Sequence, residues 1–265
     1  MESVLRIAVI YPDLLGTYGD KGNALVLAHR AAERGINTEI IQVDARRAIP
    51  EACDIYLLGG GEDAAQVAAA EGLRAAKATL ERSLAAGSAI FAVCAGFQLL
   101  GNSYAAADGS KLEGVALVDM ATTAGSNRII GEVVIAPAPS TGLPLLTGFE
   151  NHAGRTLLGP DESPLGRVTA RAKNGDSTKN GDANNAGNGT GVDGVIRDGI
   201  IGTYLHGPAL ARNPSLADYL IAYVTKSVLE PLIDTLVEQY RDERLAFASL
   251  KGAGLKRATR RLHRG

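Results

Sequence analysis

The sequence predicts an α/β fold, in which a mostly parallel central sheet has helices on both faces and gains added antiparallel strands. From the amino terminus to Gly101, short apolar runs alternate regularly with helical stretches, as in a parallel sheet built from β-α units. After Gly101 the segments become short and strand-like and are separated by Gly, Pro and Ser, which favours antiparallel strands. With 46% hydrophobic residues among 265, the chain can bury a substantial core.

The individual elements follow from local patterns of apolar residues and turn residues. Strands are expected at residues 4–11, 36–43, 54–58, 89–93, 116–120, 128–136, 155–158 and 167–172. Helices are expected at residues 24–34, as two stretches within 64–86, at 214–228 and at 232–248. Arg197-Asp198-Gly199 has the turn chemistry of a hairpin, and the strand after it runs to His206.

The domain organisation is predicted from shifts in composition. Residues 1–230 are expected to form one domain, and residues 231–265 a C-terminal helix with a basic tail that is a frayed, solvated helix end. Residues 173–193 consist almost wholly of Asn, Gly, Asp, Ser, Thr and Lys. Such a segment buries too little apolar surface to offset the entropy of ordering, so it is predicted to be a flexible loop insertion without a chemical role.

Composition excludes several classes of function. The net charge of −2 gives no electrostatic reason to expect a nucleic acid partner. No apolar run approaches the ~20 residues of a membrane span, and the amino terminus enters a strand without a signal peptide. Cys53 and Cys94 are too few for a disulfide scaffold, and a reducing cytoplasm suits an unpaired reactive thiol. We therefore expect a cytoplasmic protein that does not span a membrane.

Cys94 lies where the apolar run 89–93 ends and helical spacing begins. A nucleophile at such a sharp strand-to-helix turn projects from the sheet, and the small Ala95 and Gly96 allow a substrate to approach closely. The positive end of the helix dipole lowers the pKa of a thiol there from about 8.5. The alternative interpretation is that Cys94 is a small buried apolar residue, as most free cysteines are.

Four other features are candidates for a site near Cys94. Gly59-Gly60-Gly61 follows a strand, where backbone N–H groups can form an oxyanion hole or merely a turn. The loop 12–23 leaves the carboxyl end of the first strand, where open α/β sheets bind ligands, although a mobile connection is an equal alternative. His206 is the best-placed base for a thiol, and His152 is either a second candidate or a hydrogen-bonded structural histidine.

Three segments together resemble a known family: Gly59-Gly60-Gly61, Val93-Cys94-Ala95-Gly96-Phe97-Gln98-Leu99-Leu100-Gly101 and Gly202-Thr203-Tyr204-Leu205-His206-Gly207. They are similar to the triad-type (class I) glutamine amidotransferases, in the branch of cobyric acid synthase. The segment 148–156 and the opening 11–23 resemble that branch too, and within it the GatD family, the small glutaminase subunits of lipid II isoglutaminyl synthases. The resemblance extends from the first strand to about Tyr223.

The resemblance implies hydrolysis of L-glutamine to glutamate and ammonia. Cys94 would attack the amide carbon, and His206 would act as general base and acid. Backbone N–H groups of Ala95 and of the Gly60 neighbourhood would hold the oxyanion, and Gln98 would help to position glutamine.

Arg128 lies in the Gly/Ser turn Gly125-Ser126-Asn127-Arg128, which opens a predicted strand. Its guanidinium could clamp a carboxylate of glutamine or of the acceptor through two parallel hydrogen bonds. An ordinary exposed arginine at the start of a strand is an equal alternative.

The resemblance further implies a heterodimer with a Mur-ligase-like (MurT-like) synthetase subunit. That subunit would use ATP and Mg to activate the D-glutamate of lipid II, and ammonia from this chain would complete its amidation to D-isoglutamine in peptidoglycan biosynthesis. No metal or nucleotide motif occurs in the sequence, so no cofactor is expected in this chain.

One departure from the family pattern affects the expected triad. Many class I amidotransferases carry His-x-Glu, whereas Gly207 and Pro208 follow His206 here. We therefore expect the orienting acid to come from elsewhere in the chain, for example Glu150, or from the partner. We also expect the isolated chain to hydrolyse glutamine slowly or not at all. Three alternatives stay open: an amidotransferase of the cobyric acid type, a γ-glutamyl hydrolase-like thiol enzyme on the same fold, and a non-catalytic interaction subunit.

Overall fold

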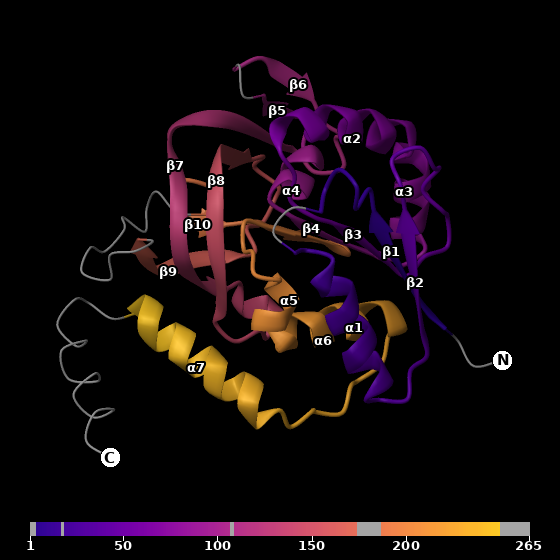
Figure 1. The fold of residues 1–265 in the computed structure, drawn as a ribbon, viewed down its shortest axis with the longest axis vertical. Coiled ribbons are helices and arrows are strands. Elements are labelled where there is room, and N and C mark those ends of the chain that lie inside the picture. The colour runs from indigo at the N-terminus through magenta and orange to yellow at the C-terminus, as the bar shows by residue number, and fades with distance from the viewer. Residues whose placement is uncertain (1–3, 17–18, 107–108, 174–186, 250–265) are drawn as a thin grey trace.

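The computed structural model describes residues 4–16, 19–106, 109–173 and 187–249, which form two sheets with their helices (Figure 1). The first sheet has the strand order β11-β12-β4-β3-β1-β2. Its strands are β1 (Leu5–Ile10), β2 (Thr38–Val43), β3 (Ile55–Leu58), β4 (Ala89–Val93), β11 (Val195–Arg197) and β12 (Ile200–Thr203). This sheet confirms the α/β fold that the alternation of apolar runs predicts.

The four central strands of this sheet are parallel and almost wholly buried. β12, β4, β3 and β1 pair in parallel, as the crossover connections through helices require. β11 instead runs antiparallel to β12, through a two-residue turn at Asp198 (φ 23°) and Gly199 (φ 82°). Two successive residues with positive φ are typical of the hairpin turn that the sequence predicts there.

Helices cover both faces of the first sheet, as predicted (Figure 1). α2, α3 and α4 lie on one face, and α1, α5 and α6 lie on the other. Their bounds are α1 (Gly22–Ala32), α2 (Asp63–Ala75), α3 (Lys77–Ala85), α4 (Ala95–Leu99), α5 (Ala209–Arg212) and α6 (Pro214–Thr225). On the second face, Asp218 links α6 to α1 and the turn after it. Its carboxylate accepts hydrogen bonds from Arg30 Nε (2.7 Å) and Arg34 Nη2 (3.0 Å).

The antiparallel strands form a second sheet of their own rather than extending the first. Its order is β10-β9-β7-β5-β6, with β8 paired to β7. Its strands are β5 (Ser103–Ala105), β6 (Lys111–Glu113), β7 (Met120–Pro137), β8 (Leu146–Leu158), β9 (Gly166–Lys173) and β10 (Val192–Asp193), and the short 3-10 helix η1 (Pro139–Thr141) connects β7 to β8.

The strand β7 is much longer than expected. The strand predicted at 128–136 belongs to this single strand, which begins at Met120 at the end of the segment 116–120, and the turn residues between them cause a register shift between Ala124 and Ile129. A bulge of this kind bends a strand without ending it. The long strand thereby carries Arg128 from the sheet to the cavity described below.

The prediction that residues 173–193 form a flexible loop insertion is partly wrong. β9 extends to Lys173, and residues 187–193 are ordered and include β10. Asn188 is buried and exchanges two hydrogen bonds with Gly194, at 2.8 and 3.0 Å. The carboxylate of Asp193 is buried as well and accepts a hydrogen bond from Thr203 Oγ1 at 2.5 Å. Polar side chains order this end because they bind backbone and hydroxyl groups. Residues 174–186 lie outside the described residues.

The C-terminal helix α7 (Thr235–Ser249) packs against β7, β8 and β9 of the second sheet (Figure 1). The predicted basic tail, from residue 250 onward, lies outside the described residues. Over the part of the chain that the structure describes, every helix is too short or too polar to cross a bilayer.

The two sheets are joined at the end of β12. The backbone of His206 exchanges hydrogen bonds with Phe149 of β8, at 2.9 and 3.2 Å. The side chain of Asn213 binds both backbone groups of Thr147 at 2.8 Å, so that the start of α6 is tied to β8 as well. These contacts place the carboxyl ends of β4 and β12 against the face of the second sheet.

Candidate active site

Cys94 lies at a sharp turn between β4 and α4, as predicted. Its backbone has φ 53° and ψ −106°, a conformation that non-glycine residues seldom adopt and that stores strain. The turn is held from both sides, because Cys94 N–H donates to Thr203 O (2.8 Å) and Gly96 N–H donates to Gly59 O (3.0 Å). A Cβ at Gly96 would lie 2.7 Å from Leu58 Cβ, so the helix can approach β3 this closely only with glycine there.

His206 follows β12 and is buried beside Cys94. Burial alone would lower the pKa of its imidazole, but hydrogen bonds to Asp20 and Cys94 raise that pKa from 6.5 to about 10. His206 Nδ1 lies 3.5 Å from Asp20 Oδ2. The imidazole therefore stands between a thiol and a carboxylate, which is the order of groups in a nucleophile–base–acid triad.

Asp20 is the residue that sequence reasoning missed. The expected sources of the acid were Glu150 and a partner, because no carboxylate follows His206 at the usual spacing. Glu150 is instead engaged elsewhere: it accepts hydrogen bonds from Arg171 Nε (2.5 Å) and from the Gly187 amide (2.9 Å). The signal available was the loop 12–23 itself, which leaves the carboxyl end of β1 and brings Asp20 to the site.

Gly60 does not have the role predicted for it. Its N–H donates to Asp20 Oδ2 at 2.8 Å, and one amide hydrogen cannot also hold an oxyanion. The neighbouring Gly61, rather than Gly60, lines the cavity beside Cys94. A Cβ on Gly59 would overlap the carbonyl oxygen of Leu15, so this glycine lets the loop 12–23 pack against the end of β3.

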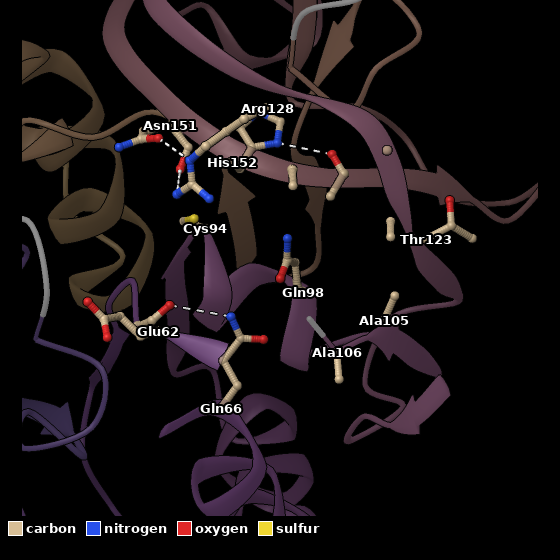
Figure 2. Close-up of a pocket in the computed structure, with 15 residues that line it drawn as sticks. Glu62, Gln66, Cys94, Gln98, Ala105, Ala106, Thr123, Arg128, Asn151 and His152 are labelled. Carbon is tan, nitrogen blue, oxygen red and sulfur yellow. Dashed lines mark hydrogen bonds between the residues drawn. The ribbon is translucent and has the colours of Figure 1, made fainter. Parts of the chain in front are cut away.

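A cavity of about 560 Å³ opens in front of Cys94, between the two sheets (Figure 2). This volume lies in the range of small-molecule sites. Its walls come from α2, α4, β5, β7 and β8 and from the turn after β3. The lining residues are Gly61, Glu62, Gln66, Cys94, Gln98, Ala105, Ala106, Thr123, Ala124, Gly125, Arg128, Asn151, His152, Ala153 and Gly154.

Arg128 reaches this cavity from the bulged part of β7. Its Nε donates to Asn151 Oδ1 (2.6 Å) and its Nη2 donates to Asn151 O (3.2 Å), which fixes the plane of the guanidinium. Figure 2 shows the guanidinium on the side of the cavity where Cys94 lies. Because Asn151 binds one edge of the fork, the opposite edge has the geometry for a carboxylate.

His152 also lines the cavity, but it has the environment of a structural histidine. Its Nδ1 is 3.0 Å from Gly154 O, and its ring stacks on Tyr204 with centroids 3.7 Å apart. Burial lowers the pKa of His152 despite the nearby Glu150, so the imidazole is neutral at pH 7. The structure thus brings His206 to Cys94 and leaves His152 in the wall.

Across the described ranges, no group of three or more His, Cys, Asp or Glu side chains has the arrangement of a metal site. The arrangement that is present, a thiol with a paired imidazole facing a polar cavity, is suited to nucleophilic attack on an acyl group.

Comparisons with known proteins agree with this geometry. Residues 6–214 match the model of the CobB/CobQ-like glutamine amidotransferase domain. The chain is 35% identical to the lipid II isoglutaminyl synthase (glutamine-hydrolyzing) subunit GatD of Staphylococcus aureus (strain N315), over 82% of this chain and 83% of that one. It is also 35% identical to the GatD subunit of Streptococcus pneumoniae (strain ATCC BAA-255 / R6), over 84% of this chain and 81% of that one.

A solved glutamine amidotransferase shares the fold, with a TM-score of 0.51 at 14% sequence identity, over 83% of this chain and 98% of that one. The fold is therefore that of the glutamine amidotransferases, and the family model covers both Cys94 and His206. The chain belongs to the CobB/CobQ-like family of glutamine amidotransferases and is a glutamine-hydrolysing enzyme.

Proposed function

We propose that this chain hydrolyses L-glutamine with Cys94 as nucleophile, His206 as general base and acid, and Asp20 as the group that orients His206. One observation carries this assignment: Asp20 Oδ2 lies 3.5 Å from His206 Nδ1, and Cys94 forms a hydrogen bond with the same imidazole. With a pKa of about 10, His206 is an imidazolium at neutral pH and can give a proton to the leaving nitrogen.

The chemistry proceeds in two halves. The Cys94 thiolate attacks the amide carbon of glutamine, and backbone N–H groups of Ala95 and Gly61 hold the oxyanion. The His206 imidazolium gives its proton to the leaving nitrogen, so that ammonia departs and a thioester remains. The neutral imidazole then takes a proton from water, whose oxygen attacks the thioester, and glutamate is released with the thiolate restored.

The acceptor of the ammonia belongs to the same proposal. The chain matches GatD subunits over more than four fifths of their length, at 35% identity. We propose that it pairs with a Mur-ligase-like synthetase, which uses ATP and Mg to activate the D-glutamate of lipid II for amidation to D-isoglutamine. Both cysteines are free thiols, which supports a place in the reducing cytoplasm.

The test is ammonia release from glutamine by the chain alone and together with such a synthetase. We expect the chain alone to release ammonia, because Asp20 supplies the orienting acid from within this chain. Amidated lipid II should appear only when synthetase, ATP and Mg are all present. Ammonia release that needs the synthetase and disappears when one of its carboxylates is mutated would instead place the orienting acid in the partner.

We expect Arg128→Ala to weaken turnover at low glutamine concentration by at least about tenfold, since a bidentate charge-assisted pair with the substrate carboxylate is lost. Arg128 is exposed, so the melting temperature should change little. Arg128→Lys should not restore activity, because lysine keeps the charge without the planar fork. The matched control is Arg167→Ala on β9, an exposed arginine away from the cavity. Unchanged turnover in Arg128→Ala would mean that Arg128 is an ordinary surface residue with no role in binding glutamine.

A further inference from the structure

The side-chain amide of Gln98 forms a hydrogen bond with Tyr204. Gln98 lies on α4, one turn after Cys94, and lines the cavity although it is almost fully buried (Figure 2). Its Nε2 donates a hydrogen bond to the hydroxyl of Tyr204 at 3.1 Å. An amide that uses its nitrogen in this way leaves its carbonyl oxygen as the acceptor for a group in the cavity.

The hydroxyl of Tyr204 is the second member of a chain of buried polar groups. It lies 2.7 Å from Thr156 Oγ1, which in turn lies 2.8 Å from Thr122 Oγ1. Either hydroxyl of each pair can be the donor, so the chain links Tyr204 to Thr156 and Thr156 to Thr122 without a fixed direction. Burial raises the pKa of Tyr204, so the hydroxyl keeps its proton.

The ring of Tyr204 is fixed independently of this hydroxyl. One face stacks on His152 with centroids 3.7 Å apart, and Phe97 meets it edge-on at 5.3 Å. Gly154 lies against the Gln98 amide, since a Cβ there would overlap Gln98 Nε2. Removal of the hydroxyl alone therefore leaves these ring contacts in place, while the Gln98 amide and the Thr156 hydroxyl lose their hydrogen-bond partner on Tyr204.

We propose that Tyr204 is a positioning residue that turns the carbonyl oxygen of Gln98 toward the substrate, where it accepts a hydrogen bond from an N–H group of glutamine. This inference rests on the proposed hydrolysis of glutamine. A freely rotating Gln98 would present its NH₂ group to that N–H for part of the time, and two donors facing each other weaken binding. Gln98 carries no proton between Cys94 and His206, so the effect falls on affinity rather than on the chemical step.

Tyr204→Phe tests the inference by removing one oxygen atom. We expect KM for glutamine to rise about tenfold while kcat stays within about twofold, because the support is lost equally for bound substrate and transition state. In the Cys94→Ala background, the Kd for glutamine measured by calorimetry should rise by the same factor. The control is Tyr56→Phe, whose buried hydroxyl bonds Ser83 Oγ (2.8 Å) and Pro50 O (2.9 Å), away from the cavity.

Thr156 gives a second, independent measurement if Tyr204→Phe folds poorly. Thr156→Val breaks the hydroxyl chain and should raise KM in the same direction, whereas Thr156→Ser keeps the hydroxyl and should restore a near wild-type KM. Unchanged KM and Kd in Tyr204→Phe and Thr156→Val would overturn the positioning role, and so would a fall in kcat alone. A wild-type chain that binds glutamine but releases no ammonia, either alone or with the synthetase, would contradict the proposed function instead.

Discussion

Cys94→Ala should lose at least about 10⁴-fold of the glutaminase activity while the protein keeps its fold. Alanine supplies no nucleophile, yet it retains the Cβ and the backbone contacts of the turn between β4 and α4. Cys94→Ser should be nearly as inactive, because this environment does not ionise a serine hydroxyl. Ammonia release and thermal unfolding, measured on the same preparations, check both parts of the expectation.

The matched control is Cys53→Ala. Cys53 precedes β3 at the opposite end of the sheet, and burial raises the pKa of its thiol, so it is unreactive at neutral pH. We expect this variant to keep wild-type activity, with a modest loss of stability because a small buried cavity forms. Substantial ammonia release by Cys94→Ala would mean that a different group performs the chemistry.

Asp20→Asn should lower kcat by about 10²- to 10⁴-fold, since an amide cannot stabilise the imidazolium of His206. The substitution is nearly isosteric, and the amide oxygen can still accept the Gly60 N–H, so the loop should keep its place. Asp13→Asn is the control, because Asp13 lies on the same loop with an exposed side chain.

The pH profile separates this role from a structural one. The pKa of His206 is raised to about 10, so the imidazolium persists at neutral pH and is lost as the pH rises through about 10. The alkaline limb of kcat/KM should therefore lie near pH 10. Without the Asp20 carboxylate this pKa falls, and the limb moves to lower pH. An unchanged limb in Asp20→Asn, together with unchanged kcat, would show that Asp20 is not the orienting acid.

Features of the fold that depend on local sequence could be predicted. Buried apolar runs predict β1, β3, β4 and β12, and the pair Asp198-Gly199 predicts the hairpin. Each of these sequence patterns lies within a few residues. The path of β7 could not be predicted, since Gly125 and its neighbours have the composition of a turn. Pairing with β8 on both sides of the register shift carries the strand through them.

The site was predictable only in part for a similar reason. Cys94 and His206 each follow a buried strand, and the end of such a strand is visible in the sequence. Asp20 carries no such mark, because what places it beside His206 is the packing of a loop between β1 and α1. Asn188 and Asp193 lie in a polar segment that resembles a flexible loop, and they are ordered by partners that the sequence does not reveal.

The positive φ of Cys94 lowers the stability of the fold at the residue that the reaction requires. A non-glycine residue in so sparsely populated a conformation costs of order 1–3 kcal/mol, and glycine carries almost none of that cost. Cys94→Gly should consequently melt at a higher temperature than Cys94→Ala. Selection for thermal stability alone would thus drive position 94 away from the one residue that supplies the thiol, and cysteine persists there only where its reactivity is under selection.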